Sequence, residues 1–133
     1  YEGICDIAII NNYYFGKLKY SEDPVQREWA KSMRLTFPNQ EEGDRGAHIN
    51  ISGGGVAKHS KNKESAIKLL EFLSNSKSQK MYSEINFEYP VNVKVEPSEE
   101  LVSWGNFRED KISIEKIAQL SIDAQKIIDR VGW

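Results

Sequence analysis

The sequence has little of the chemistry that disulfide frameworks, zinc sites or membrane spans require. Among its 133 residues there is one cysteine and there are two histidines, so no internal disulfide and no multi-cysteine zinc site can form. No apolar run approaches the ~20 residues that a transmembrane helix needs. A lone cysteine is compatible with an oxidising compartment, although it does not demonstrate one.

Charge of one sign is also lacking. Eighteen lysines and arginines stand against 20 aspartates and glutamates, which leaves a formal charge of −2. Without a basic excess to contact phosphates, nucleic acid is not an expected partner. The 39% hydrophobic and 29% charged composition is that of a globular chain, which argues against a disordered, collagen-like or coiled-coil protein.

Catalytic signatures are missing as well, and we expect that the chain is not an enzyme. No Gly-x-Ser-x-Gly elbow is present, and the three glycines at 53–55 lack the Lys-Ser/Thr ending of a phosphate loop. His48 and His59 have no cysteine nearby, so zinc chemistry has no support. The carboxylate pairs at 41–42 and 99–100 lie in polar sequence and are more typical of solvated charge.

The pattern of apolar segments predicts an α/β fold. Residues 4–10 form a near-continuous apolar run, typical of a strand covered on both faces, and shorter strands are expected at 35–38 and 48–52. The expected helices run from about 25 to 34, from 62 to 73, from 76 or 78 to 85, from 98 to 104, from 114 to 119 and from 121 to 131.

Two adjacent tyrosines, Tyr13 and Tyr14, follow the first predicted strand, at the end where α/β sheets place ligands. A phenolate is an anionic oxygen donor and suits a hard cation such as Fe(III). A free phenol keeps its proton up to pH ~10, but a strongly polarising metal can remove that proton near neutrality. The dipeptide alone is more typical of one packed and one exposed tyrosine than of a metal site.

A longer pattern surrounds the two tyrosines. Residues 9–15, Ile-Ile-Asn-Asn-Tyr-Tyr-Phe, resemble the dityrosine motif of ferric-iron-binding periplasmic proteins, the solute receptors of bacterial ferric ABC importers. Residues 46–56 resemble the interlobe return strand of this family, and residues 86–91, Asn-Phe-Glu-Tyr-Pro-Val, are similar to a more family-restricted segment. Residues 66–79 resemble a helix pair shared by many type II binding proteins, and residues 127–133 resemble the C-terminal helix of the family.

The resemblance implies an α/β type II periplasmic-binding-protein fold, with this chain as the C-terminal portion of a two-lobed receptor. Residues 1–43, with the dityrosine motif, would belong to lobe two. Residues 44–94 would return to lobe one, and residues 95–133 would cross back to lobe two. A missing N-terminal part of the same receptor is then an expected partner. The expected location is periplasmic, or extracytoplasmic with a membrane anchor.

The function implied is that of the substrate-binding component of a bacterial ferric iron ABC transporter, which delivers iron to a membrane permease. Tyr13 and Tyr14 match the paired tyrosine ligands, which would coordinate Fe(III) in a cleft between the lobes. Asn11 matches a position that hydrogen-bonds an accompanying anion, carbonate or phosphate, in some relatives. Lys17 lies near a position where some members carry an arginine, and we assign it a weak electrostatic role; a solvated lysine is the alternative.

Other assignments stay open at this point. His48 and Tyr89 match no ligand position of the motif, and the remaining iron ligands are expected in chain upstream of this sequence. Similar type II receptors bind organic solutes or oxyanions, to which the tyrosines would stack or hydrogen-bond. A small interaction module is a third possibility.

Overall fold

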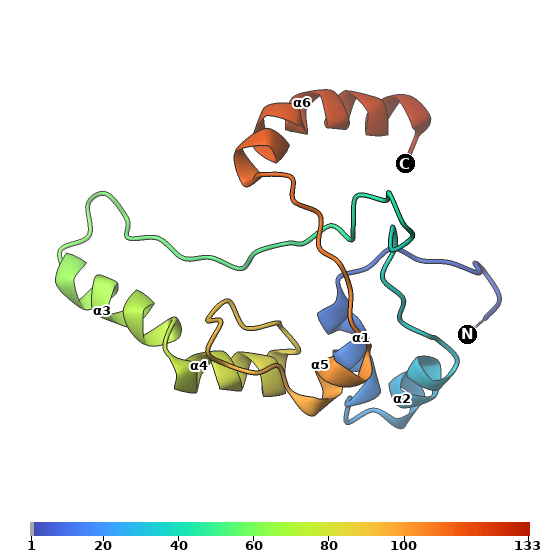
Figure 1. Cartoon of the computed structure of the whole chain (residues 1–133), viewed down its shortest axis with the longest axis horizontal. Coiled ribbons are helices and arrows are strands. Elements are labelled where there is room, and N and C mark those ends of the chain that lie inside the picture. Colours follow the sequence, from blue (N-terminus) through green and yellow to red (C-terminus); the bar gives the residue numbers. More distant parts are fainter. Residues whose placement is uncertain (1) are drawn as a thin grey trace. The chain divides into compact units, whose positions relative to one another are not determined.

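The computed structural model describes residues 2–133 (Figure 1) and divides into two compact units, which we describe separately. Unit 1 comprises Tyr1–Thr36 and Asn50–Asn106, and unit 2 comprises Phe37–Ile49 and Phe107–Trp133. The helices are α1 (Asn12–Lys19), α2 (Pro24–Lys31), α3 (Lys63–Leu73), α4 (Ser76–Met81), the π-helical turn η1 (Tyr82–Asn86), α5 (Glu99–Ser103) and α6 (Ile114–Val131).

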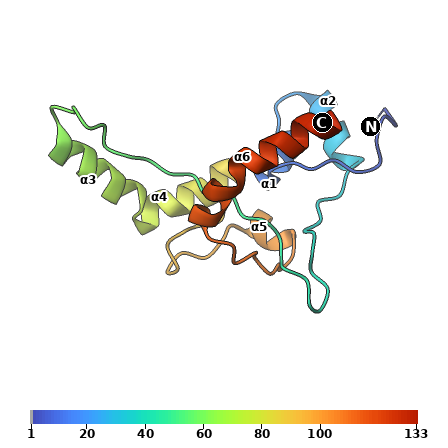
Figure 2. The same ribbon diagram turned by 90° about the horizontal axis from the view of Figure 1, so that it is seen from above.

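The predicted strands are wrong for the described residues. Segments 4–10, 35–38 and 48–52 are irregular, and Figure 2 shows the last of them continuing as an irregular run toward α3. A strand needs a neighbour to pair its N–H and C=O groups, and within residues 2–133 the one β-bridge joins Ala47 to Glu109. The apolar run is accordingly uncovered: Ile4, Ile7 and Ile9 are 83–86% exposed.

Helix α1 occupies a segment for which the sequence predicted no helix. Gly16 lies buried inside this helix, where the Phe87 side chain packs against it. A Cβ at Gly16 would overlap the Phe87 ring. A glycine inside a helix costs about 1 kcal/mol relative to alanine, so this contact explains a residue that local propensity disfavours.

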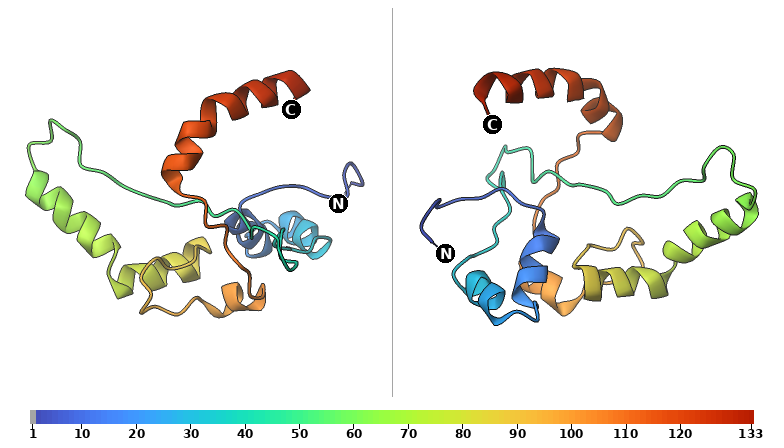
Figure 3. Two further views of the ribbon diagram at one scale, coloured as in Figure 1. Left: turned by 45° about the horizontal axis from the view of Figure 1, so that its top comes forward. Right: turned by 180° about the vertical axis from the view of Figure 1, so that it is seen from behind.

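The predicted helices of unit 1 are confirmed, with small changes at their ends. Asp23 caps α2 by accepting a hydrogen bond from the Val25 N–H, and Pro24 occupies the first helical position. Helices α1 and α2 pack against each other, and α4 follows α3 after a short break (Figures 1 and 3). The chain leaves α4 through η1 and reaches Phe87, which has a left-handed backbone with φ 59°.

Glu100 joins α1 to α5 in unit 1. Its carboxylate accepts hydrogen bonds from the Lys19 Nζ at 2.6 Å, the Tyr20 hydroxyl at 2.6 Å and the Trp104 Nε1 at 2.8 Å. Leu101, the next residue, is fully buried. The C-terminal end of α1 is therefore held by a network of charge-assisted hydrogen bonds, which are stronger than neutral ones.

Unit 2 is built on two parallel segments that meet at Ala47. The Ala47 N–H donates to the Arg108 carbonyl at 2.8 Å, and the Asp110 N–H donates to the Ala47 carbonyl at 2.8 Å. The Phe37 and Phe107 rings stack beside this pair, with centroids 4.3 Å apart. The crossing of residues 37–49 with 107–110 therefore defines this unit.

Helix α6, in unit 2, runs unbroken through the point where two separate helices were predicted. Ser121, the predicted start of the second helix, donates its hydroxyl to the Ala118 carbonyl inside the continuous helix. A serine can satisfy its side chain this way without ending a helix. Among residues 2–133 no helix is both long and apolar enough to cross a bilayer.

We expect Glu100→Gln to destabilise the protein by about 1–3 kcal/mol, because three donors lose a charged acceptor. Burial alone would raise the pKa of Glu100, but the hydrogen bonds from Lys19, Tyr20 and Trp104 outweigh burial and lower it below 4.5. The stabilisation is therefore present above pH 4.5 and is lost as the pH falls through the lowered pKa.

Urea denaturation at pH 7 and at pH 3 measures this effect. The difference between wild type and Glu100→Gln should shrink at the lower pH. The matched control is Glu28→Gln, which removes an exposed ion pair with Lys31 and should cost well under 1 kcal/mol. Equal losses in the two variants would show that the Glu100 network is not stabilising.

Candidate functional site

The two predicted ligands lie in the first turn of α1. The Tyr14 N–H donates to the Asn11 carbonyl at 3.1 Å, which starts the helix. Adjacent residues on a helix do not ordinarily face each other, yet the rings of Tyr13 and Tyr14 are tilted together with centroids 4.4 Å apart. Tyr13 is half-buried and Tyr14 is 51% exposed, so both phenols are offered at one surface.

The other two predicted site residues lie beside this pair. Asn11 is the N-cap residue of α1, but its side chain does not cap the helix; its Nδ2 donates to the Tyr13 hydroxyl at 3.2 Å. Lys17, one turn further along α1, places its Nζ 5.1 Å from the centroid of the Tyr13 ring, a cation–π distance. The structure thus brings Asn11, Tyr13, Tyr14 and Lys17 together.

The electrostatics of the pair oppose ionisation in the absence of a cation. The pKa of Tyr14 lies above 10.0, first because of its side-chain hydrogen bond with Tyr13 and then because of charge repulsion from that residue. Desolvation adds a smaller contribution in the same direction. Tyr14 therefore keeps its proton at neutral pH unless a positive charge approaches its oxygen.

Three contacts fix the helix that carries the pair. At its start, the Asn12 Nδ2 donates to the Phe87 carbonyl at 3.0 Å. In its middle, Gly16 packs on the Phe87 ring, and at its end Lys19 and Tyr20 bind Glu100. Sequence reasoning assigned no role to Asn12 or Phe87, although residues 86–91 stood out as a family-restricted segment.

Tyr89 and His48, which were not predicted to be iron ligands, have surroundings different from those of the tyrosine pair. The Tyr89 hydroxyl donates to the Leu101 carbonyl at 3.3 Å, and burial raises the pKa of Tyr89. His48 belongs to unit 2, whereas the tyrosine pair belongs to unit 1. Within the described part of the chain no three histidine, cysteine, aspartate or glutamate side chains form a group that could hold a metal ion.

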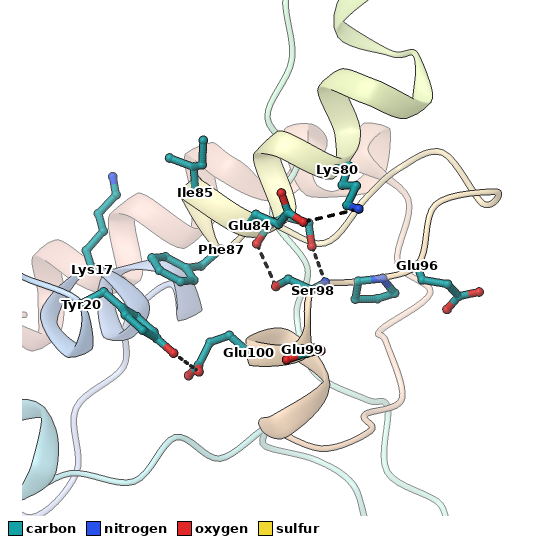
Figure 4. A pocket seen from close by; sticks show the side chains of 12 residues that line it. Lys17, Tyr20, Lys80, Glu84, Ile85, Phe87, Glu96, Ser98, Glu99 and Glu100 are labelled. Carbon is teal, nitrogen blue, oxygen red and sulfur yellow. Dashed lines mark hydrogen bonds and ion pairs between the residues drawn. The ribbon is translucent and has the colours of Figure 1, made fainter.

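An open cavity of about 820 Å³ lies on unit 1 beside α1, and Lys17, Tyr20 and Phe87 contribute to its wall (Figure 4). Glu84 pairs with Lys80 there at 3.7 Å. Tyr13 and Tyr14 are not part of its lining. The cavity is therefore separate from the tyrosine pair.

Comparison with curated proteins gives relatives that are longer than this chain. No family model matches the sequence. Iron uptake protein A1 of Synechocystis sp. is 40% identical over 131 residues, which are 98% of this chain and 36% of that protein. The chain thus spans just over a third of the length of this relative.

Solved structures agree with the sequence relatives. Ferric iron-binding protein A of Mannheimia haemolytica, in an open conformation, superposes with a TM-score of 0.87 at 46% identity, over 98% of this chain and 40% of that one. A Trichodesmium IdiA (FutA) protein in complex with iron and citrate ligands gives a TM-score of 0.83 at 44% identity, over 93% of this chain and 39% of that one.

These comparisons confirm the resemblance: the homologues of the chain are iron uptake and ferric iron-binding proteins. The fold is that of a portion of a type II periplasmic binding protein, as predicted. The names of the relatives describe iron uptake and iron binding rather than catalysis, which agrees with the prediction that the chain is not an enzyme.

We expect Tyr13→Phe to lower the pKa of Tyr14 toward 10.0, because the substitution removes both the hydrogen bond and the neighbouring phenolate charge. A pH titration followed by NMR of ¹³Cζ-labelled tyrosine measures this, with the Tyr14 resonance assigned from Tyr14→Phe. Tyr20→Phe, on the same helix end that binds Glu100, should leave the Tyr14 titration where it is. A Tyr14 pKa that stays raised in Tyr13→Phe would contradict the coupling.

Proposed function

We propose that this chain is part of the substrate-binding component of a bacterial ferric iron ABC transporter, in which Tyr13 and Tyr14 coordinate Fe(III) as phenolates. The observation that carries the proposal is the pair of phenols with ring centroids 4.4 Å apart, on a helix anchored along its length. The relatives, which are ferric iron-binding and iron uptake proteins, support the same cargo.

The chemistry follows from the raised pKa of Tyr14. Without iron, the raised pKa keeps the proton on Tyr14 at pH 7. Fe(III) would replace the phenol protons of the pair and gain two anionic oxygen donors. Iron binding must then release protons, so affinity should fall as the pH falls. Two phenolates leave one positive charge uncompensated and most coordination positions open, so the receptor must supply further ligands from other chain.

An accompanying anion fits the start of α1. The Asn11 amide already donates to the Tyr13 hydroxyl, and the first N–H groups of a helix carry partial positive charge. Carbonate or phosphate bound there would add oxygen donors to the iron. The Trichodesmium relative contains iron with citrate, which supports an oxyanion of this kind. Lys17, beside the Tyr13 ring, would stabilise the added negative charge weakly.

The wider assembly is proposed on the same basis. Residues 1–43 and 95–133 would belong to lobe two and residues 44–94 to lobe one, with the iron in the cleft between them. With these bounds, the contacts of Phe87 with α1 would join the two lobes. Closure of the lobes on iron would present the shape that a membrane permease recognises. The proposed location is periplasmic or extracytoplasmic with a membrane anchor.

The exposed surface supports a missing part of the same receptor as partner. The chain exposes 11243 Å², whereas a folded monomer of its mass, 15.2 kDa, exposes about 7,100 Å². An interface of ordinary size between two domains buries about 600–1,500 Å². Such an interface would remove only part of the difference between these two exposed areas. The exposed area includes the apolar run at 4–10, which has no pairing strand in the described chain.

We expect the double variant Tyr13→Phe, Tyr14→Phe in the full-length receptor to lose the visible phenolate-to-iron charge-transfer band. The measurement is the absorption spectrum with Fe(III) and citrate, before and after addition of a chelator. The matched control is Tyr89→Phe, whose hydroxyl binds a backbone carbonyl, and it should keep the band. An intact band in the double variant would contradict the proposal. Binding of an organic solute in calorimetry would then favour a receptor for such a solute.

We expect the amides of residues 4–10 to exchange hydrogen by orders of magnitude more slowly in the full-length receptor than in this chain alone. Pairing with a neighbouring strand would protect them, and no such pairing exists in the described chain. Hydrogen-exchange mass spectrometry of both proteins measures this. Residues 14–18, inside α1, provide the internal reference because they are helical in this chain. Equal, fast exchange at 4–10 in both proteins would contradict the proposed partner.

A further inference from the structure

Phe87 has a backbone conformation that its residue type disfavours. Its φ of 59° lies in the left-handed region, which is unfavourable for a residue with a side chain. It directly follows η1, a single π-helical turn, and it is only 7% exposed. Such strain persists where the surroundings hold it, and strained residues concentrate at functional sites.

The surroundings that hold Phe87 belong to α1. Its carbonyl accepts the Asn12 Nδ2 at 3.0 Å, and its ring lies against the α-carbon of Gly16, where no Cβ would fit. The same ring stacks on Tyr20 with centroids 5.4 Å apart and an interplanar angle of 16°. Phe87 therefore contacts the start, the middle and the end of the helix.

These contacts bracket the tyrosine pair. Asn12 directly precedes Tyr13, and Gly16 lies two residues after Tyr14. A shift of the helix on Phe87 would move both phenol oxygens together, because an α-helix moves as a rigid element. The left-handed backbone aims the Phe87 carbonyl at Asn12 while its ring covers Gly16, and a right-handed residue at this position would not supply both contacts in the same way.

We propose that Phe87 is a positioning residue for the Tyr13–Tyr14 pair, acting through its ring on Gly16 and through its carbonyl on Asn12. This inference rests on the proposed function and assigns a role in iron binding to the family-restricted segment 86–91. Groups outside the coordination sphere that orient metal ligands change metal affinity by about 10–100-fold when they are removed.

A double-mutant cycle in the full-length receptor tests the contact directly. Gly16→Ala adds a methyl group that overlaps the ring, and Phe87→Gly removes the ring while keeping a residue that adopts a positive φ freely. Each single variant is expected to weaken Fe(III) binding about 10–100-fold and to shift the phenolate-to-iron band. The double variant should recover part of both, because the added methyl group occupies the volume that the ring left.

Asn12→Ala tests the second contact without changing the packing on Gly16. It removes the donor to the Phe87 carbonyl and should weaken iron binding in the same direction. The control is Phe37→Ala, which breaks the aromatic stack with Phe107 in unit 2 and should lower thermal stability while leaving the band wavelength unchanged. Affinity is measured by competition with citrate, and the band is recorded on iron-saturated protein.

The outcomes separate this inference from the proposed function. If Gly16→Ala and Phe87→Gly lower thermal stability but keep the wild-type band and affinity, Phe87 is only a structural residue and the inference is wrong. Strictly additive effects in the cycle would also overturn it. In both cases, loss of the band in Tyr13→Phe, Tyr14→Phe would still uphold the proposed function. A band that persists in that double variant would contradict the proposed function itself.

Discussion

The packing of the Phe87 ring on the α-carbon of Gly16 is the contact on which the position of α1 depends. It requires a residue without a Cβ inside a helix and a phenylalanine in a left-handed backbone, two features that are each unfavourable by themselves. Interiors are close-packed, so a helix seated in this way has little freedom to slide. The hydrogen bonds of Asn12 at one end and of Glu100 at the other then fix its direction.

A fixed helix matters because it holds the two phenol rings close together. The hydrogen bond with Tyr13 and the charge repulsion from it raise the pKa of Tyr14. Ionisation of Tyr14 is therefore unfavourable while no cation is bound. In the proposed site, a trivalent cation would reverse that balance, since it would interact with both oxygens at once. The helix start, the Asn11 amide and the Lys17 ammonium add further positive potential near the pair. The proposed site would therefore favour a multiply charged cation together with an anion over a neutral solute.

The apolar segments of the chain need surfaces that the described residues do not provide. Leu101 and Phe87 are buried, whereas the isoleucines of the first segment are almost wholly exposed. Hydrophobic side chains of this size lose about 1.5–3 kcal/mol each by remaining in water. This cost, together with unpaired backbone groups along residues 4–10, is consistent with a chain whose relatives are more than twice as long.

The sequence by itself determined the helices that carry a local signal, such as α2 with its Asp23 cap, and it placed the tyrosine pair and its neighbours in one short segment. Lys17 lies beside Tyr13 because a helix brings residues one turn apart onto one side. The sequence also identified residues 86–91 as distinctive, without a reason.

Tertiary structure decided the rest. It turned the segment around Gly16 into a helix, because a contact with a residue 71 positions away outweighs the low helix propensity of glycine. It left the apolar runs unpaired, because a strand is stable only beside a neighbour. Local pattern is a property of adjacent residues, so it could single out the segment that carries the proposed ligands. The contacts that hold α1 come from chain that is distant in sequence, and local pattern could not predict them.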